Sequence, residues 1–223
     1  VAEDSLFQGC WAGDCEHCHA GDKAGHGGAI FTDRGTLTVR RCDFVNNAQA
    51  IWAWSVKGKD SSQAVTIADS TFTNNHANGS GAALANQWSK VVFTNTTFVG
   101  NAATKGGGVL YDDTRSTTVF VDSTFSDDNT GHENAVSVVV SKGNTSVGGG
   151  TFRVKSAEEG SPAKVHEAFA GCSVHNLKVQ VIKTDDTKSG FVQKDFVISM
   201  FIEPQPTLHN YKLIQQANFT TVL

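Results

Sequence analysis

The stretch DSTFTNNHANGSGAAL, residues 69–84, places a Phe three residues before an Asn and then runs through small residues into Ala-Ala-Leu. A fixed period of about 27 residues indicates a repeat architecture, in which each copy forms one structural unit. The repeated Phe residues are Phe7, Phe44, Phe72, Phe98, Phe125 and Phe152. Three residues later come Asn47, Asn75 and Asn101, with Cys10 and Asp128 in the same position of the first and fifth copies.

A second phrase of small residues alternates with the first. It reads GGAI at residues 27–30, GAAL at 81–84 and GGVL at 107–110, with weaker copies AQAI at 48–51 and ENAV at 133–136. Before each Phe lies a stretch rich in Thr and Val that alternates polar and apolar residues, as in AVTIADSTF and TTVFVDSTF. Such alternation predicts short strands with one buried face.

Together these features predict an all-β fold, a single-stranded right-handed parallel β-helix with coils of about 27 residues. The period is too short for a propeller blade, and no helical spacing separates the strands. If successive coils stack at the ~4.8 Å spacing of a parallel sheet, the repeated Phe residues form an internal column. Asn47, Asn75 and Asn101 then form a ladder at a turn, where a short polar side chain tolerates a left-handed backbone and hydrogen-bonds to its neighbours.

The two phrases resemble a known repeat. GGA[ILV] with Phe-x-x-Asn is the repeat signature of polymorphic outer membrane proteins, the surface-displayed passenger domains of certain bacterial autotransporters, and GGAI, FVNN, FTNN and FVGN are similar to it. The resemblance covers roughly residues 5–155 and implies a β-helix of the pectin-lyase-like superfamily. Because it consists of scaffold residues, it implies a fold and not an activity.

The repeat divides the chain into three parts. Residues 1–26 are expected to form a Cys-rich N-terminal cap or first coil, and residues 27–155 the regular coils. Residues 156–223, where the Phe-x-x-Asn phrase is absent, are expected to form degenerate coils or capping strands. Such a cover is expected because the last coil of a solenoid otherwise leaves an open sheet edge.

Composition narrows the classes of function. The formal net charge of −4 provides no attraction to nucleic acid or to an anionic membrane. No apolar run approaches the ~20 residues that a membrane-spanning helix needs, so neither a nucleic-acid partner nor a transmembrane segment is expected. Together with the clustered cysteines, N-x-Ser/Thr sequons predict an extracellular or cell-surface glycoprotein, although a chain rich in Asn and Thr also produces them by chance. The sequons begin at Asn78, Asn95, Asn144 and Asn218.

Three of the five cysteines, Cys10, Cys15 and Cys18, fall within nine residues. The simplest interpretation is a disulfide-stapled loop or cap at the first coil, within reach of Cys42 on the next repeat. Cys172 is then the expected odd thiol, if it is not itself paired with Cys42.

The same cluster has two alternative interpretations that involve cofactors. Cys15-x-x-Cys18-His19 matches the c-type haem attachment pattern, and Cys15, Cys18 and His19, with His17 or His26, provide ligand types that zinc prefers. The haem pattern has no surrounding helix, and a second Cys-x-x-Cys is missing. No cofactor is therefore expected.

Parallel β-helices are often polysaccharide lyases or hydrolases, which draws attention to carboxylates. Asp112 and Asp113, with Gly25-His26-Gly27, superficially resemble the DD and GHG motifs of polygalacturonases. The two motifs occur in the reverse order, however, and the other motifs of that family are absent. Asp127 and Asp128 are explained by the fourth position of the Asn ladder, so no catalytic residue is predicted.

Trp52, Trp54 and Trp88 are candidates for stacking on glycans, because exposed aromatic rings stack on sugars and a regular coil has little internal room for indole. Trp52 and Trp54 fall on one face of a strand. The alternative is burial beneath a loop.

The sequence thus predicts a non-catalytic extracellular or cell-surface β-helix with a structural, adhesion or surface-assembly role, of which glycan binding is one form. Glycans, other surface proteins and further copies of the chain are the expected partners. The alternative is a polysaccharide-active enzyme, a lyase or a glycoside hydrolase, with a groove on one face of the β-helix.

Overall fold

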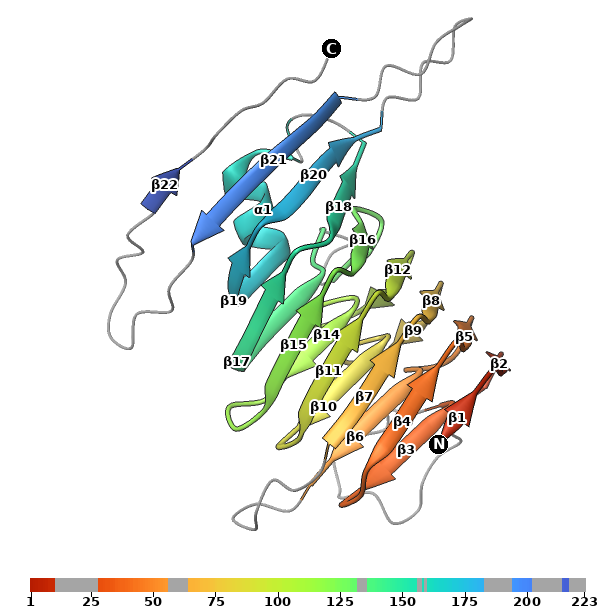
Figure 1. Ribbon diagram of the computed structural model, residues 1–223. Coiled ribbons are helices and arrows are strands. Elements are labelled where there is room, and N and C mark those ends of the chain that lie inside the picture. Colours follow the sequence, from red (N-terminus) through yellow and green to blue (C-terminus); the bar gives the residue numbers. More distant parts are fainter. Residues whose placement is uncertain are drawn as a thin grey trace, which may run out of the picture.

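The computed structural model describes residues 1–10, 28–55, 64–131, 136–155, 158, 160–182, 194–201 and 214–216. In it the chain winds into a solenoid whose short strands stack coil upon coil (Figure 1). Strands of successive coils pair in parallel, with partners about 27 residues apart. The predicted all-β parallel β-helix is therefore confirmed. Within the described residues, no helix is long and apolar enough to cross a membrane.

Three parallel sheets form the walls of the solenoid. Sheet I contains β3 (Ile30–Asp33), β6 (Ile51–Trp54), β10 (Leu84–Gln87) and β14 (Leu110–Asp112). Sheet II contains β1 (Ala2–Glu3), β4 (Leu37–Arg40), β7 (Ala64–Ala68), β11 (Lys90–Thr94) and β15 (Thr117–Val121). Sheet III contains β2 (Leu6–Gln8), β5 (Asp43–Val45), β8 (Thr71–Thr73), β12 (Thr97–Val99), β16 (Thr124–Ser126), β18 (Thr151–Val154) and β20 (Leu177–Val181). Between sheets III and I lie the short paired strands β9 (His76–Ala77) and β13 (Ala102–Ala103).

Sheets I and II join at the C-terminal end of the regular coils. The long strand β17 (Val139–Gly148) pairs with β14 through its first residues and with β15 through its last ones. Strand β19 (Phe169–His175) pairs in parallel with both parts of β17. The sequence did not predict α1 (Pro162–Ala168), which precedes β19 and has a Pro in its first turn, where the missing N–H costs no hydrogen bond.

Beyond the regular coils, the described residues include both parallel and antiparallel strands. β19 and β20 add one more parallel layer to the solenoid. β21 (Lys194–Phe201) then pairs antiparallel with β20, and β22 (Ile214–Gln216) pairs antiparallel with β21 (Figure 1). The change of direction ends the parallel stacking, as a solenoid end requires.

The repeated Phe residues line the inside of sheet III. Phe44, Phe72, Phe98, Phe125 and Phe152 are fully buried, and Phe7 is partly buried at the N-terminal end of the column. The rings from Phe7 to Phe125 stack with centroid distances of 4.6–5.4 Å. A second column, Phe93 and Phe120 of sheet II, meets the first edge-to-face. Aromatic side chains from sheets II and III therefore pack against each other in the core.

Asn47, Asn75 and Asn101 form a buried hydrogen-bonded ladder beside the Phe column. In each rung the side-chain Nδ2 donates to the carbonyl of the Phe one coil back, as from Asn75 to Phe44 at 3.0 Å. The Oδ1 accepts from the backbone N–H of the preceding Asn, as from Asn47 to Asn75 at 3.0 Å. Every rung therefore satisfies two backbone groups of the preceding coil, a carbonyl and an N–H, that would otherwise be buried without partners.

Two details of the predicted ladder are wrong. The fourth rung is Asn129 and not Asp128, because residues 127 and 128 form an additional turn that delays the rung by one position. The left-handed backbone also lies elsewhere: φ is positive at Asn46 and Asn74, one position before the ladder, where the side chains are exposed. In the first coil the backbone N–H of Cys10 donates to Asn47 Oδ1 at 2.9 Å.

Candidate functional site

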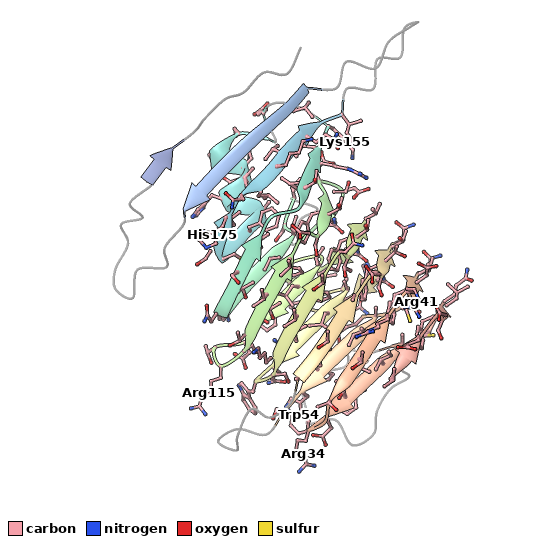
Figure 2. The ribbon with its side chains drawn as sticks, in the orientation of Figure 1. Arg34, Arg41, Trp54, Arg115, Lys155 and His175 are labelled. Carbon is pink, nitrogen blue, oxygen red and sulfur yellow. The ribbon has the colours of Figure 1, made fainter. Side chains whose placement is uncertain are left out.

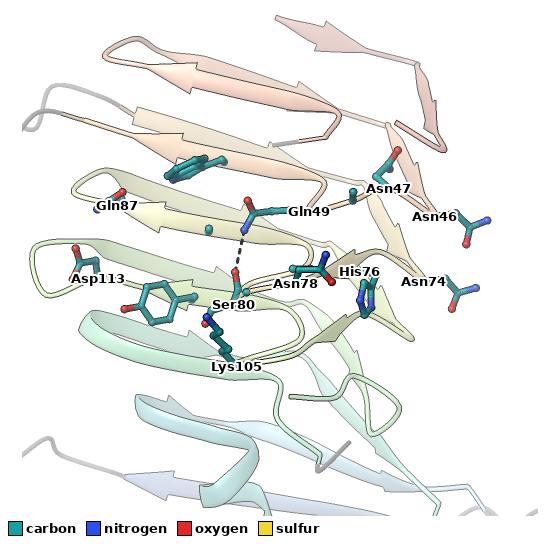
Figure 3. Close-up of a pocket in the computed structure, with 16 residues that line it drawn as sticks. Asn46, Asn47, Gln49, Asn74, His76, Asn78, Ser80, Gln87, Lys105 and Asp113 are labelled. Carbon is teal, nitrogen blue, oxygen red and sulfur yellow. Dashed lines mark hydrogen bonds between the residues drawn. The ribbon is translucent and has the colours of Figure 1, made fainter. Parts of the chain in front are cut away.

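A groove of about 590 Å³ lies on the outer face of sheet I and the turns beside it (Figure 3). Its floor is a row of in-register residues, Trp52 on β6, Ala85 on β10 and Tyr111 on β14. Strand alternation turns these side chains outward, since their neighbours Ile51, Leu84 and Leu110 are fully buried. Because Ala85 is small, it leaves a gap between two aromatic residues that lie two strand spacings, about 10 Å, apart.

Both aromatic residues of the floor have further contacts. Phe31 precedes Trp52 in the same row; its side chain is 51% exposed and its ring meets the indole edge-to-face at 5.7 Å. On the other side of the groove, Lys142 Nζ lies 5.8 Å from the centroid of the Tyr111 ring, which is cation–π distance. These contacts help to orient the two rings.

Polar side chains from the turns between sheets III and I form one wall of the groove. Asn46 and Asn74 lie on successive coils, and each directly precedes a residue of the Asn ladder, Asn47 or Asn75. Gln49 Nε2 donates to the carbonyl of Ser80 at 3.0 Å and ties two adjacent turns together (Figure 3). Amide groups both donate and accept hydrogen bonds, so this wall matches the alternating donors and acceptors of sugar hydroxyls.

Few charged groups line the groove. Among its described lining residues Asp113 is the sole carboxylate and Lys105 the sole Lys or Arg, and His76 provides an imidazole. Asp113 Oδ1 accepts a hydrogen bond from the backbone N–H of Thr114 at 2.7 Å. Glycoside hydrolysis generally uses two carboxylates that flank the scissile bond, and the described part of this groove offers one.

A polar cluster lies inside the coil directly beneath the floor. Asp112 is fully buried; Thr118 Oγ1 donates to its Oδ1 at 2.8 Å, and Thr145 Oγ1 donates to its Oδ2. Burial raises the pKa of Asp112 to about 6, and the hydrogen bonds from Thr145, Thr118 and Asn86 act in the opposite direction. Burial, together with the nearby charge of Asp112, raises the pKa of the Cys172 thiol.

The adjacent carboxylates Asp112 and Asp113 point to opposite sides of the wall. Asp112 faces the core, whereas Asp113 lies at the groove. The resemblance to a catalytic DD motif therefore has no counterpart in the structure, because the two groups do not face one ligand. His26 lies outside the described residues.

Of the three tryptophans considered for glycan stacking, Trp52 lines the groove. Trp54 shares its strand and face but lies at the corner that also carries Arg34 and Arg115 (Figure 2). Trp88 lies in the turn after β10 with a positive φ of 64°, and its backbone N–H donates to Ser116 Oγ at 2.9 Å. The groove thus includes the first of the three.

Three of the cysteines lie within the described residues. Cys10, Cys42 and Cys172 carry free thiols. Neither Cys10 nor Cys42 forms a disulfide in this structure, and the alternative pair of Cys42 with Cys172 is also not formed. Cys42 is fully buried and its Sγ lies 3.2 Å from the carbonyl of Arg40, inside the coil. Cys15 and Cys18 lie outside the described residues, and a clip between them stays a prediction.

The alternative cofactor sites fall in the same undescribed segment. Cys15, Cys18 and His19, with His17 and His26, lie outside the described residues. In the described part of the chain, no group of three or more His, Cys, Asp or Glu side chains is placed to hold a metal ion. The haem and zinc alternatives thus stay untested.

The glycosylation sequons occupy different environments. Asn78, Asn95 and Asn144 are all exposed, and Asn78 lines the groove. Asn218 lies outside the described residues.

Most residues of the groove were not predicted from the sequence, although the repeat contains a pattern that marks the residues of its floor. Phe31, Trp52, Ala85 and Tyr111 each directly follow a copy of the small-residue phrase, so they occupy equivalent outward positions. The wall residues come from turns of unequal length, and no repeat marks them.

One comparison with known proteins identifies a family. Residues 3–125, more than half of the chain, match the model described as the right handed beta helix region. Comparisons with curated proteins and with solved structures each gave no match. The chain therefore belongs to the right-handed β-helix family.

Proposed function

We propose that this chain is a non-catalytic, extracellular or cell-surface glycan-binding module that holds a polysaccharide in the groove of sheet I. The observation that carries the proposal is the row Trp52–Ala85–Tyr111, in which a gap one residue wide separates two aromatic residues. Aromatic faces stack on the apolar faces of sugar rings, and the amide wall offers hydrogen bonds to their hydroxyls. The row crosses the strands, so the bound sugar chain would run along the solenoid axis.

A role in adhesion or surface assembly follows from the same groove. A module that binds a polysaccharide attaches its carrier to a coat or to a neighbouring cell. The resemblance of the repeat phrases to polymorphic outer membrane proteins supports surface display. The sequons support passage through a secretory route. Other surface proteins, or further copies of this chain, are the alternative partners.

The proposal is tested with a panel of soluble and insoluble polysaccharides and three variants. Trp52→Ala and Tyr111→Ala should each weaken binding about tenfold, which corresponds to about 1.4 kcal/mol for a lost stacking contact. Trp54→Ala is the matched control, because it removes the same side chain from the same face of β6 outside the groove. Absence of binding to every polysaccharide, or an equal loss in the control, would overturn the proposal.

The second candidate function is a polysaccharide lyase. It is favoured by one observation: His76, Lys105 and Tyr111, three side chain types that act as general bases, line the same groove. A lyase would release unsaturated products from a polymer. Assays for unsaturated and reducing ends on the same panel, with and without Ca²⁺, separate the two functions, because turnover is incompatible with a purely binding module.

A further inference from the structure

Asn78 occupies an unusual place for a surface asparagine. It lies in the turn between β9 and β10, is exposed, and lines the groove (Figure 3). It begins the sequon Asn78-Gly79-Ser80. A Cβ added at Gly79 would meet nothing within 4 Å, so the turn projects into open space. The sequon is thus on a surface turn, the setting that N-glycosylation favours.

The asparagines of the other two described sequons are also exposed, but the residue that follows each of them is buried. Asn95 Nδ2 donates to Asp69 Oδ1 at 2.8 Å, and Thr96, the middle residue of that sequon, is fully buried. Asn144 lies within the long strand β17, in register with Thr117 of β15. Of the three, the sequon at Asn78 is the one that combines a turn with open surroundings.

We propose that Asn78 is a site of N-linked glycosylation and that the attached oligosaccharide lies over the groove and closes it to other glycans. In the transfer step, Asn78 Nδ2 forms a bond to the anomeric carbon of a lipid-linked oligosaccharide. The bond from that carbon to the donor's pyrophosphate breaks, the amide nitrogen loses one proton, and the lipid pyrophosphate leaves. Glycosylation of Asn78 thereby determines whether other glycans can enter the groove.

The position of Asn78 gives the attached sugar a direct route to the floor. His76, in β9, and Ser80, on the same turn as Asn78, flank Asn78 and line the groove with it. The oligosaccharide is tethered, so its effective concentration at the groove is high, in the mM range for a short flexible link. A free glycan must compete with this local concentration. The closure rests on the proposed glycan binding; the modification itself does not.

The test uses the full chain from two sources: a bacterial host, which leaves Asn78 bare, and a eukaryotic secretory host. Glycopeptide mass spectrometry measures occupancy at each sequon, and we expect Asn78 to be modified. Acylation of lysines then reports shielding: Lys105, in the groove, should react severalfold more slowly in the glycosylated protein, whereas the exposed Lys90 of β11 should not change. Trimming with an endoglycosidase should restore the reactivity of Lys105.

Binding to the polysaccharide panel completes the test. We expect the bare protein to bind and the glycosylated protein to bind at least about tenfold more weakly, with recovery after trimming. An unmodified Asn78, equal reactivity of Lys105 in the two forms, or equal binding by both would overturn the inference. If the bare protein binds no glycan, the proposed function fails instead, and the reactivity of Lys105 still decides whether the oligosaccharide covers the groove.

Discussion

Sheets I and III belong to the same coils but differ in how strictly they repeat. Inside sheet III every coil from β5 to β18 contributes a buried Phe, and outside it one in-register row reads Thr71, Thr97, Thr124 and Thr151, while the other varies from Val45 to Arg153. Inside sheet I one row is regular, Ile51, Leu84 and Leu110, but the other changes from Ala53 to Asn86 to Asp112. The outward row changes from Phe31 through Trp52 and Ala85 to Tyr111.

The difference separates the scaffold from the site. Identical residues in register make identical contacts on every coil, which produces a uniform wall with no distinct binding position. A groove requires coils that differ, and sheet I has a small residue between two large ones. In this solenoid, departure from the repeat therefore marks the groove. The following predictions test that division.

The largest effect is expected in the scaffold, for Phe98→Ala. Phe98 is fully buried and its ring contacts those of Phe72, Phe93, Phe120 and Phe125 at centroid distances of 5.3–5.8 Å. Its removal leaves a cavity between two columns and should lower the free energy of unfolding by about 3–5 kcal/mol. Chemical denaturation followed by circular dichroism measures the loss.

The matched control for this variant is Phe31→Ala, which removes the same side chain from sheet I. Phe31 is 51% exposed, so its loss should cost well under half as much as the loss of Phe98. Equal costs for the two variants would mean that the Phe column has no special role in the scaffold.

The same division explains what could be predicted from the sequence. The Phe column and the first rungs of the Asn ladder follow from equal spacing, because parallel strands bring residues one period apart into register. The ladder prediction went wrong at Asp128, where the turn of residues 127 and 128 changed the local count. Asn129 is the rung there, and a period alone does not reveal such an insertion.

The groove was harder to predict, for a physical reason. Gln49, Asn78 and Lys105 come from three different turns and meet only because the coils stack. The buried position of Asp112 is also not predicted by the repeat, because a carboxylate inside the coil requires hydroxyl donors, here Thr118 and Thr145, from other strands. Such partners are visible only once the register is known.

An intermediate effect is expected from the polar interior of sheet I as the pH changes. The pKa of Asp112 is about 6 in the folded chain, against a usual value of 3.8, so the folded state holds this proton more tightly than the unfolded state. The stabilising contribution is complete below about pH 4 and is lost as the pH rises through 6. A difference of about two pKa units corresponds to roughly 3 kcal/mol.

Thermal unfolding between pH 4 and pH 7.5 measures this dependence. The groups that face Asp112 are Thr118, Thr145, Asn86 and the Cys172 thiol. Asp112 is the carboxylate among these described groups, so the pH dependence is assigned to it. Asp112→Asn should remove much of the decline in stability with rising pH, whereas Asp113→Asn, in the groove, should preserve it. An unchanged pH profile in Asp112→Asn would show that the buried carboxylate does not control the dependence.

Among the variants of this Discussion, Ala85→Leu is expected to change stability least and polysaccharide binding most. Ala85 is the one small residue between Trp52 and Tyr111, and a leucine side chain there would fill the gap between their rings. Ala85 points outward but is only 9% exposed, so the added atoms must fit between its neighbours, and the free energy of unfolding should change by about 1 kcal/mol or less. Binding of the tightest polysaccharide of the panel should fall at least about tenfold.

Ala170→Leu is the control for this variant, because Ala170 occupies the same outward row two strands beyond Tyr111 and lies outside the groove. It adds the same side chain to the same wall and should leave binding unchanged. If Ala85→Leu bound as tightly as the unmodified chain, the gap between the two rings would not be the binding position. Function would then have to be sought on the outer face of sheet III, where a row of Thr recurs on successive coils and where a ligand would recognise the repeat itself.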